Sequence, residues 1–263
     1  MAAMSQLVRL AVVDVDGCLT PGEAGAWNWK AIQAICDFNR RARRGERVPA
    51  VTLCTGRQQP YVEVLMQAIG AHYPGIYENG GGLYCPDGYR FVEHPSITPS
   101  LREALAAAKA TLHRQVVAPG LGYFQPGKET SLTLYPLPGI GVDHLRAAVA
   151  EALAAHGAGD QVTVQASVSC VDVTPAGIDK GTGVRWLSEE VGIPLADLGG
   201  VGDSTSDLKF LHLVGQSAAP ANATAEVKAS VGYVSPHVDG DGVLDILQHW
   251  SSQPPEKLSF LDR

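Results

Sequence analysis

Two aspartates, Asp14 and Asp16, end the first apolar run of the chain and are its most chemically suggestive residues. The run is LAVV at residues 10–13, and Gly17 follows the second acid. A buried strand that ends in paired carboxylates, with no basic residue beside them, places negative charge where desolvation is costly. We therefore expect a cation at this position.

Other polar residues stand at comparable places further along the chain. Thr55 follows the apolar run at residues 48–54, and Asp203 follows the run at 198–202. Open α/β sheets bind ligands outside the carboxyl ends of their strands, so these side chains are expected to meet at one edge. Hard oxygen ligands suit Mg²⁺. The predicted magnesium ligands are Asp14, Asp16, Asp203 and Asp207.

The charges at this edge favour chemistry on a phosphate monoester. Mg²⁺ and Lys180, which begins a predicted helix, would neutralise the charge that repels a carboxylate from the phosphate dianion. Asp14 is then the expected nucleophile, which forms an aspartyl-phosphate. Asp16 is the expected general acid and base. The predicted catalytic residues are Asp14, Asp16, Thr55, as a hydrogen-bond donor, and Lys180.

The elements that position these residues alternate between strand and helix. Strands are predicted at 48–54, 75–77, 198–202, 216–219 and 232–234, and helices at 27–44, 61–69 and 181–191. Short loops between such elements are typical of a doubly wound parallel sheet, an α/β fold. The segment between is different, with alanine-rich helices at 101–112 and 142–155 and strands at 131–135, 161–165 and 167–173.

We therefore predict a catalytic core formed by residues 1–93 and 177–263, with an α+β cap domain at 94–176. The tail at 251–263, with two adjacent prolines, is predicted to be loosely ordered.

The composition excludes several classes of partner. The net charge of −7 argues against nucleic-acid or anionic-membrane binding, which need a basic surface. No apolar run approaches the roughly 18 residues that span a bilayer. Five scattered cysteines and no leader favour a cytoplasmic protein with reduced thiols. The expected partner is a small phosphorylated metabolite, and both a monomer and a homodimer remain open.

Four segments resemble the motifs of the haloacid dehalogenase (HAD) superfamily of phosphatases, in the family's order. They are DVDGCLT at 14–20, LCTGR at 53–57, GIDKGTGV at 177–184 and GDSTSDLKF at 202–210. The position of the insertion, and YENGGGLY at 77–84, resemble the type IIB cap subclass. The segment PANAT at 220–224 is similar to archaeal-type phosphoglycolate phosphatases. A weaker resemblance extends to sucrose-phosphate and mannosyl-3-phosphoglycerate phosphatases.

This resemblance implies a magnesium-dependent phosphatase that acts on phosphoglycolate or a sugar phosphate. It also implies that the substrate is bound by Thr55, Gly56, Arg57, Asn79, Lys180 and Asn222, the last in a loop that orients Lys180 or the phosphate. One departure is Ser206, where many subclass members have an asparagine that helps hold the metal site.

The sequence leaves some alternatives open. A phosphotransferase of the phosphomannomutase type would use the same core residues, with the aspartyl-phosphate passed to a sugar hydroxyl. A non-catalytic binding module is disfavoured, because every charged motif residue is present. Arg57 is equally well explained as a surface cation. In the cap loop at 120–129, Tyr123, Gln125 and Lys128 are either substrate-reading residues or ordinary exposed residues.

Overall fold

The core of the protein is a five-stranded parallel sheet with the order β12-β11-β10-β1-β2. The computed structural model describes residues 8–22, 24–155 and 160–252. The predicted doubly wound sheet is confirmed. Its strands are β1 (Leu10–Val13), β2 (Ala50–Leu53), β10 (Leu198–Val201), β11 (Gln216–Ala219) and β12 (Tyr233–Val234).

Apolar residues on both faces of β1 explain why helices cover the sheet on two sides. Ala11 and Val13 belong to one buried cluster, and Leu10 and Val12 belong to the other. A strand that is buried on both faces reads as a continuous apolar run. The first cluster includes residues of α1 (Trp29–Arg43), α2 (Gln59–Ala68) and α8 (Asp239–Ser252); the second includes residues of α5 (Lys180–Val191), α6 (Leu208–Leu211) and α7 (Ala225–Ser230).

The strand predicted at 75–77 does not extend the parallel ladder as expected. β3 (Gly75–Tyr77) pairs antiparallel with β4 (Gly82–Cys85), which pairs in turn with β5 (Arg90–Glu93). Its link to the core sheet is an isolated parallel bridge between Cys54 and Ile76. The glycine-rich turn that follows β3 reverses the chain, and this reversal makes the antiparallel pairing possible.

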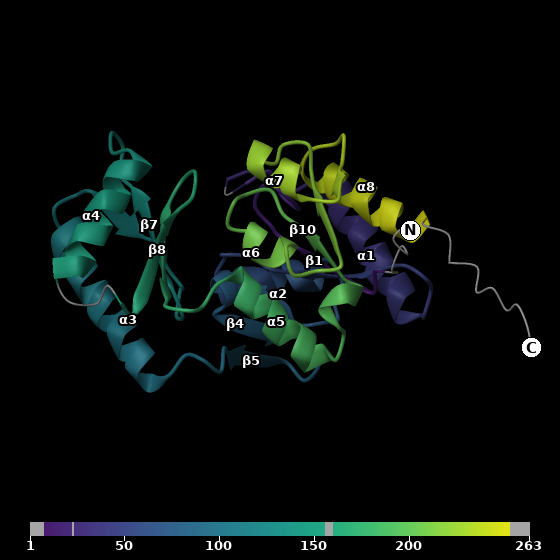
Figure 1. Ribbon diagram of the computed structural model, residues 1–263, viewed down its shortest axis with the longest axis horizontal. Helices are drawn as coiled ribbons and strands as arrows, with labels where there is room; N and C mark the ends of the chain where they lie inside the picture. The colour runs from purple at the N-terminus through teal and green to yellow at the C-terminus, as the bar shows by residue number, and fades with distance from the viewer. Residues whose placement is uncertain (1–7, 23, 156–159, 253–263) are drawn as a thin grey trace, which may run out of the picture.

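A second lobe lies between β5 and α5 in the chain and beside the core in space (Figure 1). Its antiparallel sheet has the order β6-β7-β9-β8, and α3 and α4 pack on one face of that sheet. The other face is turned toward the core. The elements are α3 (Pro99–Leu112), η2 (His113–Val117), β6 (Gly122–Phe124), β7 (Leu132–Pro136), α4 (Val142–Ala155), β8 (Val162–Ala166) and β9 (Val171–Pro175).

The sequence prediction for this lobe was close but incomplete. The start of α3 carries the expected cap, because the Thr98 hydroxyl accepts the N–H of Leu101. The strand predicted at 167–173 begins only at Val171, because the preceding residues form the turn after β8. β6 was missed.

The end of the chain also differs from the prediction. α8 was not predicted, and it extends through Ser251 and Ser252, which had been placed in a loosely ordered tail. The rest of that predicted tail, residues 253–263, lies outside the described residues. In the part of the chain that is described, no helix is both long and apolar enough to span a bilayer.

Candidate active site

Three neighbouring strands of the core sheet lead into the predicted functional residues. β1 lies between β2 and β10, so the residues that follow them, Asp14, Thr55 and Asp203, reach the same edge. Asp14, Asp203 and Asp207 each offer a carboxylate oxygen within 4.8 Å of the others. The expected convergence of distant motif residues is therefore present in the structure.

Lys180 joins the two most deeply buried acids of this cluster. Its Nζ lies 3.0 Å from Asp14 Oδ1 and 2.6 Å from Asp207 Oδ1. Burial alone would lower the pKa of Lys180, but Asp14 and Asp207 outweigh it and hold that pKa well above its usual value. Burial, and then repulsion by Asp207, raises the pKa of Asp14. Burial and the neighbouring carboxylates therefore oppose ionisation of Asp14 even beside Lys180.

The start of α5 fixes the position of Lys180. The Asp179 carboxylate accepts the N–H of Thr182 at 2.8 Å, and the Thr182 hydroxyl accepts the N–H of Asp179 at 3.0 Å. This reciprocal pair is a capping box, which holds the first helical turn. Lys180 is the first residue of the helix, so its backbone is held within that box.

Asp207 is surrounded by donors and organises the loop after β10. Its Oδ2 accepts the N–H of Asp203 at 3.0 Å, the N–H of Ser204 at 2.9 Å and the Ser204 hydroxyl at 3.0 Å. With Lys180 on Oδ1, both oxygens are engaged. Ser206, at the position of the family's asparagine, lies 2.9 Å from Ser204 through its hydroxyl. Asp207 therefore holds Asp203 and Lys180 in place from behind the site.

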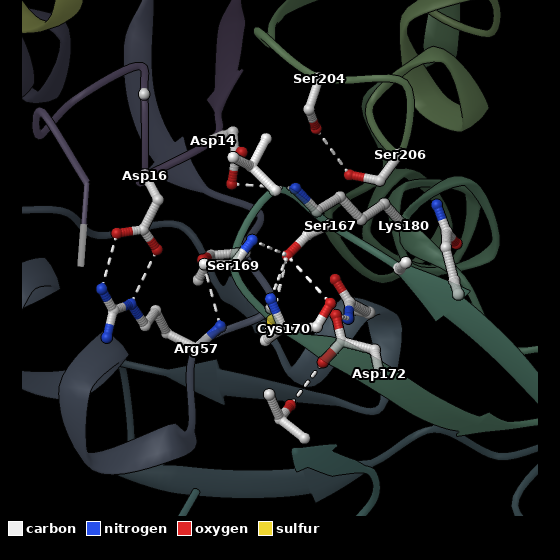
Figure 2. Close-up of a pocket in the computed structure, with 18 of the residues that line it drawn as sticks. Asp14, Asp16, Arg57, Ser167, Ser169, Cys170, Asp172, Lys180, Ser204 and Ser206 are labelled. Atoms are coloured by element: carbon white, nitrogen blue, oxygen red, sulfur yellow. Dashed lines mark hydrogen bonds and ion pairs between the residues drawn. The ribbon is translucent and has the colours of Figure 1, made fainter. Parts of the chain in front are cut away.

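Asp16 does not join this acidic cluster, in contrast to its predicted role as a side-chain metal ligand. Its carboxylate accepts two hydrogen bonds of 2.7 Å from Arg57, at Nε and Nη2 (Figure 2). The Arg57 guanidinium also lies 4.8 Å from the centre of the Tyr61 ring. A bidentate pair of this kind fixes the orientation of both groups. Arg57 is therefore a pocket residue rather than a surface cation.

Gly17 is the point where the first motif approaches Asp203 most closely. Its φ is +81°, and a Cβ atom there would lie 2.3 Å from Asp203 Oδ2. We expect Gly17→Ala to lower the free energy of unfolding, by about 1–3 kcal/mol from backbone strain and further through displacement of Asp203. Urea unfolding measures this loss.

Gly45→Ala is the matched control. Gly45 has a φ of +78°, and a Cβ atom there would have no neighbour within 4 Å. This substitution therefore introduces the same backbone strain without the contact. Equal losses in the two variants would contradict a steric role for Gly17.

Thr55, Gly56 and Asn79 line one wall of the pocket. Thr55 is buried, and its Oγ1 accepts the N–H of Arg57 at 3.2 Å, which leaves the hydroxyl proton available for a ligand. Asn79 Nδ2 donates to Asp172 Oδ2 at 3.3 Å. The Asn79 amide also lies against Gly56, where a Cβ would meet its oxygen at 3.0 Å.

The pocket has a volume of about 660 Å³ and is lined by residues of both lobes. Side chains alternate between the two faces of a strand, and this explains how the sheet of the second lobe presents polar residues to the pocket. Leu132, Leu134, Val171 and Val173 pack into the core of that lobe. The residues between and after them point the other way. The polar lining residues from this sheet are Thr133, Tyr135, Gln165, Asp172 and Thr174.

The three candidate residues of the cap loop lie in different places. Gln125 and Lys128 line the pocket, but Tyr123 does not; it is 49% exposed and stacks on Tyr135. Asn222 is also absent from the lining. Its amide donates to Gly17 O at 2.8 Å and accepts the N–H of Asp239 at 2.9 Å. It therefore supports the first motif and does not contact Lys180 or the pocket.

Comparisons with known proteins agree with this geometry. The haloacid dehalogenase-like hydrolase family matches residues 143–247. A phosphoglycolate phosphatase of Thermoplasma volcanium is 28% identical over 93% of this chain and 99% of its own length. The chain therefore resembles the haloacid dehalogenase-like hydrolases. Its enzyme class is that of the phosphoric monoester hydrolases, as predicted.

Several solved structures share the fold of this chain. A protein from Thermoplasma acidophilum has a TM-score of 0.72 at 24% identity, covering 93% of this chain and 98% of that one. The sucrose-phosphatase from Synechocystis, solved with sucrose and phosphate, has a TM-score of 0.67 at 17% identity, with 93% and 98% coverage. Matching structures also include a subclass IIB sugar phosphatase. The predicted resemblance to these groups is confirmed.

Two residues of this hydrolase were missed by the sequence analysis. Asp172 lies in β9, where its oxygens accept from the Thr133 hydroxyl and from Asn79. The alternation VDVT at residues 171–174 is the signal that pointed to a polar face. Glu78 is 1% exposed and follows β3. It was quoted within a motif but was given no role.

Proposed function

We propose that this hydrolase is a magnesium-dependent phosphatase that cleaves a small phosphate monoester through an aspartyl-phosphate on Asp14. The observation that carries the proposal is the buried Asp14 carboxylate at the pocket wall. Lys180 lies 3.0 Å from it, and Asp203 completes the acidic cluster. A carboxylate flanked by fixed positive charge is suited to attack an anionic ester.

The acidic cluster fits a magnesium ion. Three carboxylate oxygens within 4.8 Å of one another form a hard-oxygen set. Asp207 is already engaged by Lys180, Ser204 and the N–H of Asp203, so Asp14 and Asp203 are the proposed direct ligands, with Asp207 behind them. When bound, Mg²⁺ supplies positive charge that offsets the repulsion between the carboxylates and the phosphate dianion.

Each of the other proposed roles in the reaction belongs to a residue that lines the pocket. Asp14 attacks phosphorus, the ester P–O bond breaks, and Asp16, which must first leave Arg57 and take a proton from solvent, donates that proton to the departing alkoxide. Water then attacks the aspartyl-phosphate, Asp16 takes its proton, and inorganic phosphate leaves with Asp14 restored. Lys180 and the Thr55 hydroxyl hold the phosphoryl oxygens during both steps.

Phosphoglycolate is the first proposed substrate, and a sugar phosphate is the second. The name of the T. volcanium relative, which aligns over nearly the whole chain, supports the first. The pocket volume of about 660 Å³ and its polar face from the second lobe leave room for the second.

A screen of phosphate esters with Mg²⁺ tests the proposal. Release of inorganic phosphate is expected, together with one phosphoryl group on Asp14 after acid quenching, located by mass spectrometry of the digested protein. Transfer to a hexose phosphate without release of phosphate would favour the phosphomannomutase-type alternative. Absence of turnover on every ester would refute both.

We expect Mg²⁺ to stabilise the fold, and to do so more strongly at pH 8 than at pH 6. Burial, and then repulsion by Asp207, raises the pKa of Asp203 to about 7 without metal. Protons therefore compete with the metal below pH 7, and the competition disappears above it. A ligand that binds only the folded state raises its stability. Thermal unfolding at both pH values, without Mg²⁺ and with one fixed Mg²⁺ concentration of roughly 100 times the dissociation constant at pH 8, measures the shift.

Asp203→Asn is the control for this measurement. It keeps the shape of the side chain but removes one ligand charge, so the shift should shrink at pH 8. A shift that is independent of pH in the unmodified protein would contradict the assignment of Asp203.

A further inference from the structure

Glu78 is the most deeply buried glutamate among the described residues, and it lies in the core between β3 and β4. It is 1% exposed, with a φ of +50°. Its donors all come from the other lobe, in the segment 129–131. They are the N–H of Glu129 at 3.0 Å, the N–H and hydroxyl of Thr130 at 2.9 Å and 3.0 Å, and the Ser131 hydroxyl at 2.9 Å.

Burial of the Glu78 carboxylate costs free energy unless its oxygens remain hydrogen-bonded. Among the described residues, no lysine or arginine forms an ion pair with Glu78. A buried carboxylate without a cation depends on its hydrogen bonds for its stability. The four donor groups therefore fix the segment 129–131 firmly against the core.

Lys128 directly precedes that segment and enters the pocket. Its side chain is 4% exposed, and its Nζ donates to Gly56 O at 2.6 Å and lies 3.8 Å from Asp172 Oδ1. Gly56 follows Thr55, the proposed phosphoryl ligand. An ammonium group has three donors, and Gly56 O is the one acceptor among the described residues within hydrogen-bond distance of it. A further donor is therefore available to a ligand in the pocket that Lys128 lines.

The turn that holds Glu78 also touches the helix of Lys180. A Cβ on Gly80, which has a φ of +100°, would lie 2.2 Å from Asp179 O. Asn79 reaches Asp172 in the opposite direction. The turn at residues 78–80 therefore contacts the chain beside two buried lysines of the same pocket. These are Lys128 from the second lobe and Lys180 from the core.

Building on the proposed phosphatase function, we propose that Glu78 is a positioning residue that places Lys128 to bind an anionic oxygen of the substrate. The anionic oxygen belongs either to the phosphoryl group or to a carboxylate beside it, as in phosphoglycolate. Glu78 itself does not touch the substrate. Its effect is transmitted through the backbone of residues 129–131.

Steady-state kinetics with phosphoglycolate and with ethyl phosphate, which lacks the carboxylate, tests the proposal. Lys128→Met should raise KM roughly ten- to hundredfold, the value of a charge-assisted hydrogen bond, with a smaller change in kcat. A rise for both esters assigns Lys128 to the phosphoryl group, and a rise for phosphoglycolate alone assigns it to the carboxylate. An unchanged KM for both overturns the proposal.

A double-mutant cycle isolates the role of Glu78. Glu78→Ala should raise KM as Lys128→Met does, and the double variant should be no worse than Lys128→Met alone, since the two act as a unit. Glu78→Gln, which keeps one acceptor oxygen, should restore part of the affinity. Additive effects on KM would mean that Glu78 acts independently of Lys128, and would overturn its positioning role.

Two controls separate this result from loss of fold and from failure of the proposed function. Glu129→Ala removes an exposed side chain but keeps the N–H that Glu78 accepts, so KM should not change. If Glu78→Ala does not fold, Thr130→Ala with Ser131→Ala removes two donors and should raise KM in its place. An unmodified enzyme that hydrolyses neither ester refutes the phosphatase assignment for these substrates, whereas normal turnover with unaffected variants refutes only this inference.

Discussion

Asp14→Asn is expected to abolish phosphate release, with a loss of about 10⁴-fold or more in kcat, the scale seen when a nucleophile is removed. The amide has the shape of the carboxylate but cannot form the aspartyl-phosphate. Steady-state assays with Mg²⁺ at saturating substrate measure the loss.

The same variant should fold at least as well as the unmodified protein. Asp14 is 5% exposed, and its charged form is opposed by burial and by Asp207. Lys180 keeps Asp207 as a partner at 2.6 Å. Thermal unfolding should therefore show an equal or higher midpoint. Retained turnover would refute the nucleophile assignment, and an unfolded variant would refute this account of the charges.

Lys180→Met is expected to damage both activity and stability. It leaves Asp14 and Asp207 buried without their cation, and removal of one member of a buried ionic cluster costs about 3–5 kcal/mol. Turnover should fall below detection, because the phosphoryl group loses its fixed positive charge. Urea unfolding at pH 7 measures the first effect, and phosphate release measures the second.

The pH dependence of the stability loss in Lys180→Met tests the role of the buried carboxylates. Without Lys180, the folded state holds protons on the buried carboxylates that the unfolded chain has released, so its stability rises as pH falls. The deficit relative to the unmodified protein should therefore shrink between pH 7 and pH 5. Lys228→Met, which removes an exposed lysine that donates to Ala221 O, is the control and should show no such dependence. An equal deficit at both pH values would contradict the role assigned to Lys180.

The sequence predicted the core well because its signals are local and strong. The apolar runs before Asp14, Thr55 and Asp203 predict parallel strands, and parallel strands bring their ends together regardless of separation in the chain. The structure places all three at one edge. The alanine-rich segment at 142–155 was predicted as a helix, and the described residues form a helix over that range.

The partners of individual side chains could not be predicted in the same way. The spacing of Asp16 from Asp14 does not reveal that Arg57 will hold it by two hydrogen bonds. Asn222 lies in a family motif, yet its amide bonds to Gly17 and Asp239 instead of the pocket. The hydrogen bonds to Glu78 depend on how two lobes meet, which no local pattern encodes. Tertiary contacts, rather than propensity, decide these outcomes.

The capping box at the start of α5 fixes the backbone of Lys180 close to an unrestrained glycine. The chain leaves the second lobe at β9 and passes Gly177, whose φ is +80° and where a Cβ atom would have no neighbour within 4 Å. Two residues later, Asp179 and Thr182 lock the helix. Gly177 therefore has open space around its backbone, while the capping box fixes the first turn of the helix that carries Lys180. A sterically unrestrained glycine thus lies only three residues before a lysine whose backbone is locked by hydrogen bonds.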